Sequence, residues 1–367
     1  MTGTYINATG LFTPPHAISN EELVEAFNRF VALENPARAE RGEEALAESN
    51  AEFIFKASGI RSRYVMDREG VLDPLRMGPY LPERPQNSLS LQAEMACAAA
   101  RDALANAGLE PSDIDCVIVA CSNSQRPYPA IAIEVQAELG IQGFAYDMNV
   151  ACSSATFGAQ NAKSAIESGA AKRVLMVNPE VCTGHLDFRD RDCHFIFGDV
   201  CTAVVFEGEP RGHSWEMVGT RLHTTFSSNI RNDSGFLDRH DGSKPSDRRK
   251  LFHQQGRRVF KDVCPMVADL IKAHLDETRV PIPEVKRFWL HQANLSMNAL
   301  IARRVLGRDA TAEEAPVVLD EYANTSSAGS IIALHKHRAD LAVGDVGVLC
   351  SFGAGYSVGS VVLRRVS

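Results

Sequence analysis

The segments Asn149-Val-Ala-Cys-Ser-Ser-Ala-Thr-Phe-Gly158 and Asn324-Thr-Ser-Ser-Ala328 decide the fold of this chain. When Cys152 is aligned with Thr325, both segments continue as Ser-Ser-Ala, and apolar segments on either side have counterparts too. The paired segments are Ile114–Ala120 with Val285–Leu290, Lys172–Val177 with Asp345–Cys350, and Phe197–Phe206 with Phe352–Leu363. A chance likeness between Ser/Ala-rich segments would not extend to the flanks, so the sequence indicates that one unit occurs twice.

Each copy of the unit alternates apolar strands with helices. Leu91–Ala107 and Ser153–Ser168 are predicted helices, and each is followed by a glycine, a common helix terminator. Val259–Leu275 is the expected counterpart of the first. Strands that alternate with helices are typical of α/β proteins, in which helices cover both faces of parallel sheets. We therefore expect an N-terminal half at residues 1–211 and a C-terminal half at residues 212–367.

Three segments fall outside the repeat. Residues 28–52 are rich in Ala, Glu and Arg and are predicted to form a solvated helix. Residues 67–87 are rich in proline and charge and are predicted to form a long loop. Residues 225–256 are polar and include Asp247-Arg-Arg-Lys250. Long excursions of this kind are either lids and binding loops or plain surface decoration.

Composition excludes several classes of protein. The net charge of −8 argues against nucleic-acid binding, which needs a basic face. There is no run of 18 apolar residues, so we expect no membrane span. The first residues lack the basic and apolar regions of a secretory signal, so we expect none. Nine scattered cysteines without a C-x-x-C pair argue against disulfides and zinc and favour the reducing cytoplasm.

Cys152 is the candidate nucleophile. It stands where an apolar segment ends and the predicted helix Ser153–Ser168 begins. The unpaired N–H groups and the partial positive charge of a helix N-terminus favour a thiolate, and such sites lower a cysteine pKa from about 8.5 to about 3.5–7.5. The alternative is an inert core cysteine, as most buried cysteines are.

His291 and Asn324 are the expected partners of Cys152. His291 follows the apolar strand Val285–Leu290, and Asn324 lies at the second copy of the strand-to-helix turn. A cysteine can hold an acyl group as a thioester. A neutral histidine and an amide can donate hydrogen bonds to the carbonyl oxygen of a second thioester, which gains negative charge when a neighbouring carboxylate leaves as CO₂. One well-placed donor is worth about 2.7–4 kcal/mol in such a step.

At these residues the chain resembles the β-ketoacyl-acyl carrier protein synthase III family of thiolase-like condensing enzymes. The matching motifs are Gly59–Arg63, Asn149–Gly158, Phe197–Asp199, His291–Leu295, Ala323–Ala328 and Phe352–Gly359. The resemblance implies a thiolase-like α/β fold of five layers (αβαβα), made of two duplicated βαβαβαββ-type halves, and a homodimer. It also implies that an acyl-CoA primer condenses with malonyl-acyl carrier protein, with loss of CO₂, in fatty acid biosynthesis and without a cofactor or metal.

The resemblance also assigns roles to individual residues. Cys152 would carry the acyl group, while His291 and Asn324 would promote decarboxylation. Phe352 would shield the departing carboxylate. The backbone N–H of Ala354, where the family usually has glycine, would join that of Cys152 in an oxyanion hole.

Three departures from the family concern the substrate. Family members that use short acyl-CoA often hold its adenine between a tryptophan and an arginine, but the corresponding residues here are Phe53 and Ala57. The residue expected to reach across the dimer into the acyl tunnel is Tyr128, and the starter can be a medium chain. Ser296 replaces a basic residue after His291–Leu295.

Other basic residues are candidates for docking the acidic carrier protein. They are Arg303, Arg304 and Lys261. The alternative for these three is solvated helix charge, which usually signifies little.

The sequence also contains features of other kinds of protein. His185, Cys193, His194 and three aspartates lie within ten positions, but their spacing fits no common metal site, so we expect a polar loop near the substrate entrance. Related enzymes with this fold could join two acyl-CoA molecules head to head or make a secondary-metabolite ketide. A silent partner subunit that only binds is a third reading, although the cysteine, histidine and asparagine are all present.

Overall fold

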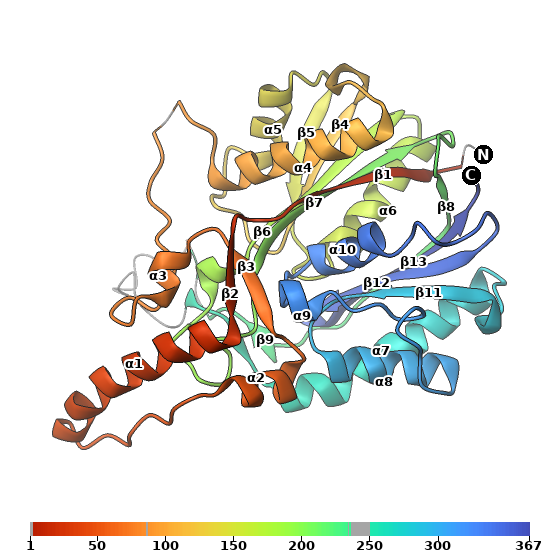
Figure 1. Cartoon of the computed structure of the whole chain (residues 1–367). Helices are drawn as coiled ribbons and strands as arrows, with labels where there is room; N and C mark the ends of the chain where they lie inside the picture. The colour runs from red at the N-terminus through yellow and green to blue at the C-terminus, as the bar shows by residue number, and fades with distance from the viewer. Residues whose placement is uncertain (1–2, 86, 234, 236–249) are drawn as a thin grey trace.

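The computed structural model describes residues 3–85, 87–233, 235 and 250–367. Its main feature is a nine-stranded mixed sheet with helices on its faces (Figure 1). In spatial order the strands are β11 (Val285–Leu290), β12 (Val346–Gly353), β13 (Ser357–Arg365), β8 (Trp215–Thr224), β1 (Tyr5–Phe12), β7 (Asp199–Glu207), β6 (Arg173–Val181), β4 (Cys116–Ala120) and β5 (Phe144–Met148).

The strand pairing repeats the duplication seen in the sequence. In the first half β4 is parallel to β6, which is antiparallel to β7, which is antiparallel to β1. In the second half β11 is parallel to β12, which is antiparallel to β13, which is antiparallel to β8. The halves join where Tyr5 and Ile6 of β1 pair with Glu216 and Trp215 of β8. Each predicted pair of equivalent strands thus occupies equivalent places in the two halves.

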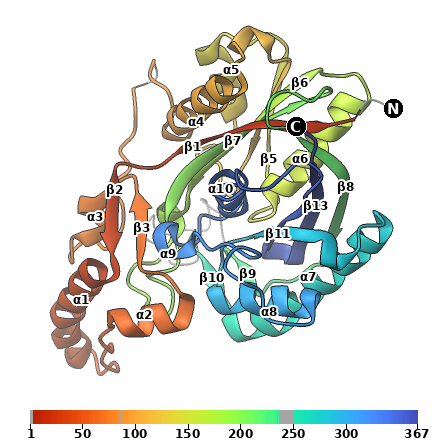
Figure 2. The same cartoon turned by 45° about the vertical axis from the view of Figure 1, so that its right-hand side comes forward.

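The helices form three layers around the two halves of the sheet (Figures 1 and 2). Alternate strand residues face opposite layers: Val117 and Val119 of β4 pack with the outer helices, whereas Ile118 packs with the central ones. The outer helices are α4 (Leu91–Ala107) and α5 (Ile131–Leu139) on the first half, and α7 (Gly256–Glu277) and α8 (Leu295–Leu306) on the second. The central helices are α6 (Ser154–Glu167) and α10 (Ala328–Lys336). The expected five-layer α/β fold is therefore confirmed.

Helix α6 lies close to the strands because its inward face is made of small residues. A Cβ added to Gly158 would lie 2.5 Å from Met176 Sδ on β6 and 3.0 Å from Ala120 Cβ on β4. Only glycine permits that approach. The helix touches β12 and β13 as well as β4 and β6, so the element that follows Cys152 is held by both halves.

The N-terminal excursion differs from its prediction. Residues 28–52 are not one solvated helix: α1 (Asn20–Glu40) buries Phe27, Phe30 and Val31, residues 41–50 are not helical, and α2 (Ala51–Ser58) follows. The apolar side chains on one face of α1 pack into a hydrophobic cluster that includes Phe195, Ile196 and Phe197, so this segment is part of the core and not a solvated addition. The strand before α1, β2 (His16–Ser19), pairs antiparallel with the strand after α2, β3 (Ser62–Val65).

The other two excursions contain little regular structure. Within residues 67–87 the structure has one short helix, α3 (Arg68–Leu72), and the rest of the described part is loop. In residues 225–256 the two-residue strands β9 (Ile230–Arg231) and β10 (His253–Gln254) pair, and Asp247-Arg-Arg lies outside the described residues. A further short helix, α9 (Leu319–Tyr322), precedes Asn324. No helix in the described part of the chain is long and apolar enough to cross a membrane.

Candidate active site

Cys152 sits on a sharp turn between β5 and α6. Ala151, directly before it, has φ of +47°, a left-handed conformation that costs energy in a residue other than glycine. Ser154 stabilises the turn, because its Oγ accepts the Val150 N–H at 2.9 Å and donates to the Ala151 carbonyl at 2.7 Å. Strain held in place by neighbouring hydrogen bonds is common at functional sites. It fixes the direction of the Cys152 side chain.

The Cys152 sulfur is enclosed by residues of the second half. Ser326 Oγ donates to Sγ at 3.3 Å, and the backbone N–H of Ala354 points at the same sulfur. A Cβ on Gly353 would lie 2.6 Å from Cys152 Cβ, so position 353 tolerates only glycine. Ala354 has no left-handed φ, so its side chain is accepted without strain and the amide remains available.

The expected low pKa of Cys152 is wrong. Burial raises the pKa of the thiol to about 11, and the charge of Glu180 acts in the same direction. Hydrogen bonds from Ser326, the Ala354 N–H and the Cys152 N–H act the other way but do not compensate. Desolvation disfavours a thiolate, and here it outweighs the donors at the turn. The resting group at neutral pH is therefore a thiol.

His291 follows β11 and is held at the mouth of the second half of the sheet. Its backbone N–H donates to the Cys350 carbonyl at 2.8 Å. Burial lowers the pKa of the imidazole to about 4, although a backbone hydrogen bond with Ser326 acts in the opposite direction. The ring is thus neutral, as the sequence argument required. Its Nδ1 is buried and has no hydrogen-bond partner among the described residues, and Phe352 contacts the ring edge-on at 5.1 Å between centroids.

Asn324 is fixed by both halves of the molecule. Its backbone N–H donates to the Ile196 carbonyl at 3.0 Å, and its carbonyl accepts the Gly198 N–H at 3.2 Å. Its side-chain Oδ1 accepts the Ser326 N–H at 2.9 Å. Because the amide oxygen is used in this way, the NH₂ group is turned to the cavity, where it can donate to a bound molecule.

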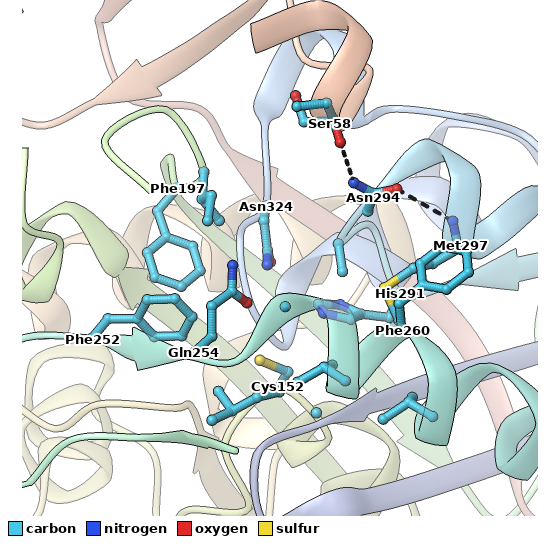
Figure 3. Close-up of a pocket in the computed structure, with 18 of the residues that line it drawn as sticks. Ser58, Cys152, Phe197, Phe252, Gln254, Phe260, His291, Asn294, Met297 and Asn324 are labelled. Atoms are coloured by element: carbon cyan, nitrogen blue, oxygen red, sulfur yellow. Dashed lines mark hydrogen bonds between the residues drawn. The ribbon is translucent and has the colours of Figure 1, made fainter. Parts of the chain in front are cut away.

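Cys152, His291 and Asn324 line one cavity of about 730 Å³, together with Phe352 and Gly353 (Figure 3). Figure 3 shows the three side chains facing one another from separate elements. The rest of the wall is largely aromatic and apolar: Phe53, Phe195, Ile196, Phe197, Ile230, Phe252, Val259, Phe260, Val263 and Met297. A thiol and two polar side chains in an apolar cavity are suited to a carbonyl group attached to an apolar group.

The mouth of the cavity departs from the expected adenine clamp. Phe53 and Ala57 both line the cavity, and neither is the tryptophan or arginine of the usual pair. However, the Arg191 guanidinium stacks on the Phe53 ring at 4.3 Å, so an aromatic–arginine pair is present from a different place in the sequence. The sequence argument did not find Arg191, because it lies 138 residues from Phe53 in the chain and only the fold brings the two together.

Glu180 is a second residue that the sequence argument missed. It lies at the end of β6, fully buried, and its carboxylate accepts the backbone N–H of Ser122 at 3.0 Å and that of Ser327 at 3.2 Å, as well as both hydroxyls. Burial raises the pKa of Glu180 despite these four donors. The carboxylate ties the first half to the turn that carries Asn324 and Ser326.

The remaining predicted residues lie outside the cavity. Lys261 on α7 and Arg303 and Arg304 on α8 are exposed, and Arg303 approaches Asp309 only at 4.0 Å. Tyr128 lies between β4 and α5 with 77% of its surface exposed, and in the single chain it does not line the cavity.

The histidines of the predicted polar loop, residues 185–194, make separate contacts. His185 hydrogen-bonds Asn123 at 2.8 Å, and His194 hydrogen-bonds the Arg191 carbonyl at 2.9 Å. Within the described ranges no group of three or more His, Cys, Asp or Glu side chains is arranged to hold a metal ion.

Comparison with known proteins agrees with this geometry. Residues 146–225 match the family 3-oxoacyl-(acyl-carrier-protein) synthase III, and residues 275–365 match its C-terminal part. The chain is 64% identical over 349 residues to a β-ketodecanoyl-(acyl-carrier-protein) synthase of Pseudomonas aeruginosa, covering 93% of this chain and all of the relative. It is 32% identical to a β-ketoacyl-(acyl-carrier-protein) synthase III of Brucella anthropi, covering 88% and 93% of the two chains.

A solved structure shares the whole architecture. It is the 3-oxoacyl-(acyl-carrier-protein) synthase III of Aquifex aeolicus, with a TM-score of 0.77, 26% identity and coverage of 99% of this chain and 100% of that one. The fold and the Cys–His–Asn site define a condensing enzyme of the thiolase-like class. Within that class, the chain belongs to the 3-oxoacyl-(acyl-carrier-protein) synthase III family.

Proposed function

We propose that this enzyme extends a medium-chain acyl starter by two carbons, using malonyl-acyl carrier protein and releasing CO₂. The observation that carries the proposal is the placement of Cys152, His291 and Asn324 around one apolar cavity. The starter length rests on the Pseudomonas aeruginosa relative, which is named for a β-ketodecanoyl product. Ten carbons less the two from malonate leave an eight-carbon starter.

The first half-reaction loads the starter on Cys152. The sulfur attacks the thioester carbonyl of the acyl-CoA, a carbon–sulfur bond forms, and the bond to the CoA sulfur breaks. Because burial keeps Cys152 protonated, the thiol loses its proton during the attack, and the proton ends on the departing CoA thiol. We assign stabilisation of the oxyanion between these two steps to the N–H groups of Cys152 and Ala354, an assignment supported by their hydrogen bonds to the resting sulfur.

The second half-reaction forms the carbon–carbon bond. The malonyl carboxylate leaves as CO₂, and its electron pair forms an enolate on the thioester carbonyl. Neutral His291 and the Asn324 amide stabilise that oxygen, while the edge-on Phe352 ring keeps the carboxylate side apolar. The enolate carbon then attacks the acyl-Cys152 carbonyl, and the sulfur leaves and regains a proton.

We further propose that the acidic carrier protein docks on α7 and α8. These helices pack together (Figure 2). Arg257 of α7 and Met297 of α8 line the cavity. Lys261, Arg303 and Arg304 are exposed on the same two helices. A local basic patch on a protein of net charge −8 favours an acidic partner at that place.

A homodimer is the proposed assembly. Strand β5 lies at the open edge of the sheet. Three apolar or aromatic side chains near this edge are exposed: Phe144 on β5 (42%), Ile133 on α5 (48%) and Tyr128 (77%). Open edges with exposed apolar side chains favour pairing with another chain. None of the nine cysteines forms a disulfide, which fits the cytoplasm that we propose as its location.

The decisive test is a panel of acyl-CoA starters from C2 to C12, each supplied with malonyl-acyl carrier protein. We expect CO₂ release and a β-ketoacyl carrier product, with the highest kcat/KM near C8, and no product from C152A. If acyl-CoA molecules condensed with each other without malonyl carrier protein, the head-to-head reaction would replace this proposal. If no starter added mass to Cys152, the chain would be a binding module.

A further inference from the structure

A second cavity, remote from Cys152, lies where the two halves of the sheet join. It has a volume of about 420 Å³ and is lined by Asn7 of β1, Trp215 of β8 and Arg365 of β13. Figure 1 marks the two chain ends, which lie near the start of β1 and the end of β13. Three arginines line it, Arg211, Arg338 and Arg365, together with two histidines, His213 and His335. None of the described residues that line it is Asp or Glu.

Arg338 has no partner for its charge. Its side chain makes no hydrogen bond or ion pair with any described residue, and its Nη1 is buried from solvent. Burial, and then the positive charge of Arg365, lower the pKa of Arg338 to about 10. A buried guanidinium is normally paired, because desolvation of an unpaired charge is costly.

The neighbouring arginines are satisfied in ways that leave positive charge in the cavity. Arg365 donates to His213 Nδ1 at 2.8 Å and to the backbone carbonyls of Ala339 and Leu341. It also donates at 3.2 Å to a main-chain oxygen of Ser367, which belongs to the carboxylate of the last residue in the sequence. Arg211 Nε lies 3.3 Å from Glu207, but that carboxylate also pairs with Arg173. The carboxylates of Glu207 and Ser367 therefore engage Arg211 and Arg365, and neither forms an ion pair with Arg338.

We propose that this cavity binds the phosphate group of a small phosphorylated molecule, with Arg338 as its principal ligand. Guanidinium forks match phosphate oxygens in geometry and charge, and Arg211 and Arg365 lie on the same cavity. Asn106, whose Nδ2 donates to the Thr9 carbonyl at 3.1 Å, retains a second amide hydrogen that can serve a ligand, whereas both ends of the Asn7 amide are already hydrogen-bonded. The cavity volume exceeds that of a bare phosphate ion, so the remainder of the molecule can also be enclosed.

Thermal unfolding in inorganic phosphate tests the site on the full chain. Wild type should melt about 2 °C or more higher in saturating phosphate than in sodium chloride of equal ionic strength. R338Q should lose that difference and, in chloride, melt no lower than wild type, because it removes an unpaired charge. R303Q on α8 is the matched control and should keep the response. Equal melting temperatures in the two salts, or a response retained by R338Q, would overturn the proposal.

Two further measurements complete the test. Phosphate should protect Arg338 but not Arg303 of the wild-type protein from phenylglyoxal, as read by peptide mass spectrometry, which answers the question even if R338Q fails to fold. Adenosine monophosphate at the same concentration shows whether the ligand is free phosphate or a phosphorylated metabolite. A larger rise in melting temperature than with phosphate identifies a phosphorylated metabolite, and an equal rise identifies free phosphate. C152A should respond as wild type does, since the site is independent of the proposed acyl transfer.

Discussion

Cys152 is a protonated thiol in the resting enzyme, and its reactivity is governed by what surrounds the sulfur. C152A should gain no acyl mass with any acyl-CoA. H291A and N324A should still become acylated but should release CO₂ from malonyl-acyl carrier protein about 10²–10³-fold more slowly, because each removes one donor to the enolate oxygen. Intact-mass spectrometry and CO₂ release measure the two steps separately. Decarboxylation by H291A at the wild-type rate would remove the role assigned to that ring.

Glu180 sets part of the Cys152 pKa from behind the site. Its charge raises the pKa of the thiol, whereas its four hydrogen bonds hold the turns of Ser122 and Ser327. E180Q removes the charge, so the pKa of Cys152 should fall below its wild-type value of about 11. Because the thiolate is the form that reacts, the alkylation rate with iodoacetamide should rise at a lower pH than in wild type.

The pH profile is read together with denaturant unfolding to separate this electrostatic effect from simple loosening of the site. Loosening would hydrate the sulfur and lower the midpoint too, but it would also lower the free energy of unfolding, which loss of the charge alone would not. C121S offers a control for buried cysteines, because Cys121 also feels Glu180 without lining the cavity. An unchanged midpoint in E180Q would mean that Glu180 only holds the turns together.

Helix α6 shows how a single element links packing to chemistry. Gly158→Ala would place a Cβ 2.5 Å from Met176 Sδ, and overpacking of this kind typically costs about 1–3 kcal/mol. The helix would move away from β6 and carry Cys152 with it, so kcat should fall together with the free energy of unfolding. Gly78→Ala is the control, since a Cβ there meets nothing within 4 Å. Denaturant unfolding measures the stability of the two variants, and a steady-state assay measures kcat. If G158A were as stable as G78A, the packing argument would be contradicted.

The two outer helices of the second half carry the docking hypothesis. The double substitution R303E/R304E on α8 should raise the KM for malonyl-acyl carrier protein at least tenfold at low ionic strength, because it reverses the charge presented to an acidic partner. The rate of Cys152 acylation by acyl-CoA should stay unchanged. The double substitution R29E/K172E, at exposed positions on α1 and just before β6, changes the net charge by the same amount and is the matched control. A KM that does not change would leave these arginines as solvated surface charge.

The sequence predicted the bounds of helices and strands well, but it predicted the burial and charge around individual site residues poorly. Leu91–Ala107 and Val285–Leu290 were predicted to the residue, because their apolar patterns and flanking breakers are local signals. The pKa of Cys152 was predicted in the wrong direction, since burial by Ser326 and Gly353 comes from residues far along the chain. Glu180 and Arg191 carry no local signature, and only the tertiary structure assigns them to the site. Residues 28–52 were misjudged because their charge concealed the buried face of α1.

At the scale of the molecule, duplication explains why the site is composite. The equivalent turns of the two halves supply Cys152 and Asn324, and α6 and α10 pack between the two parts of the sheet. Glu180 then bridges the first half to Ser327 at the start of α10. The residues at the two equivalent turns could change independently, one to a cysteine and the other to an asparagine, while the duplicated scaffold held both turns at the same cavity.

The open edge of the sheet extends this logic to a second chain. Phe144 on β5 is 42% exposed, and F144D would place a charge at the proposed dimer interface, so this variant should elute as a monomer in size-exclusion chromatography. L33D, which adds the same charge at another exposed apolar position on α1, controls for solubility effects.

Tyr128 is 77% exposed in the single chain and is expected to enter the partner's acyl tunnel. Y128A should therefore remain a dimer but accept longer starters, because a smaller side chain lengthens the tunnel. The panel of acyl-CoA starters from C2 to C12 measures that change in preferred length. If Y128A kept the wild-type preference for starter length, Tyr128 would belong to the surface of the dimer and not to its acyl tunnel.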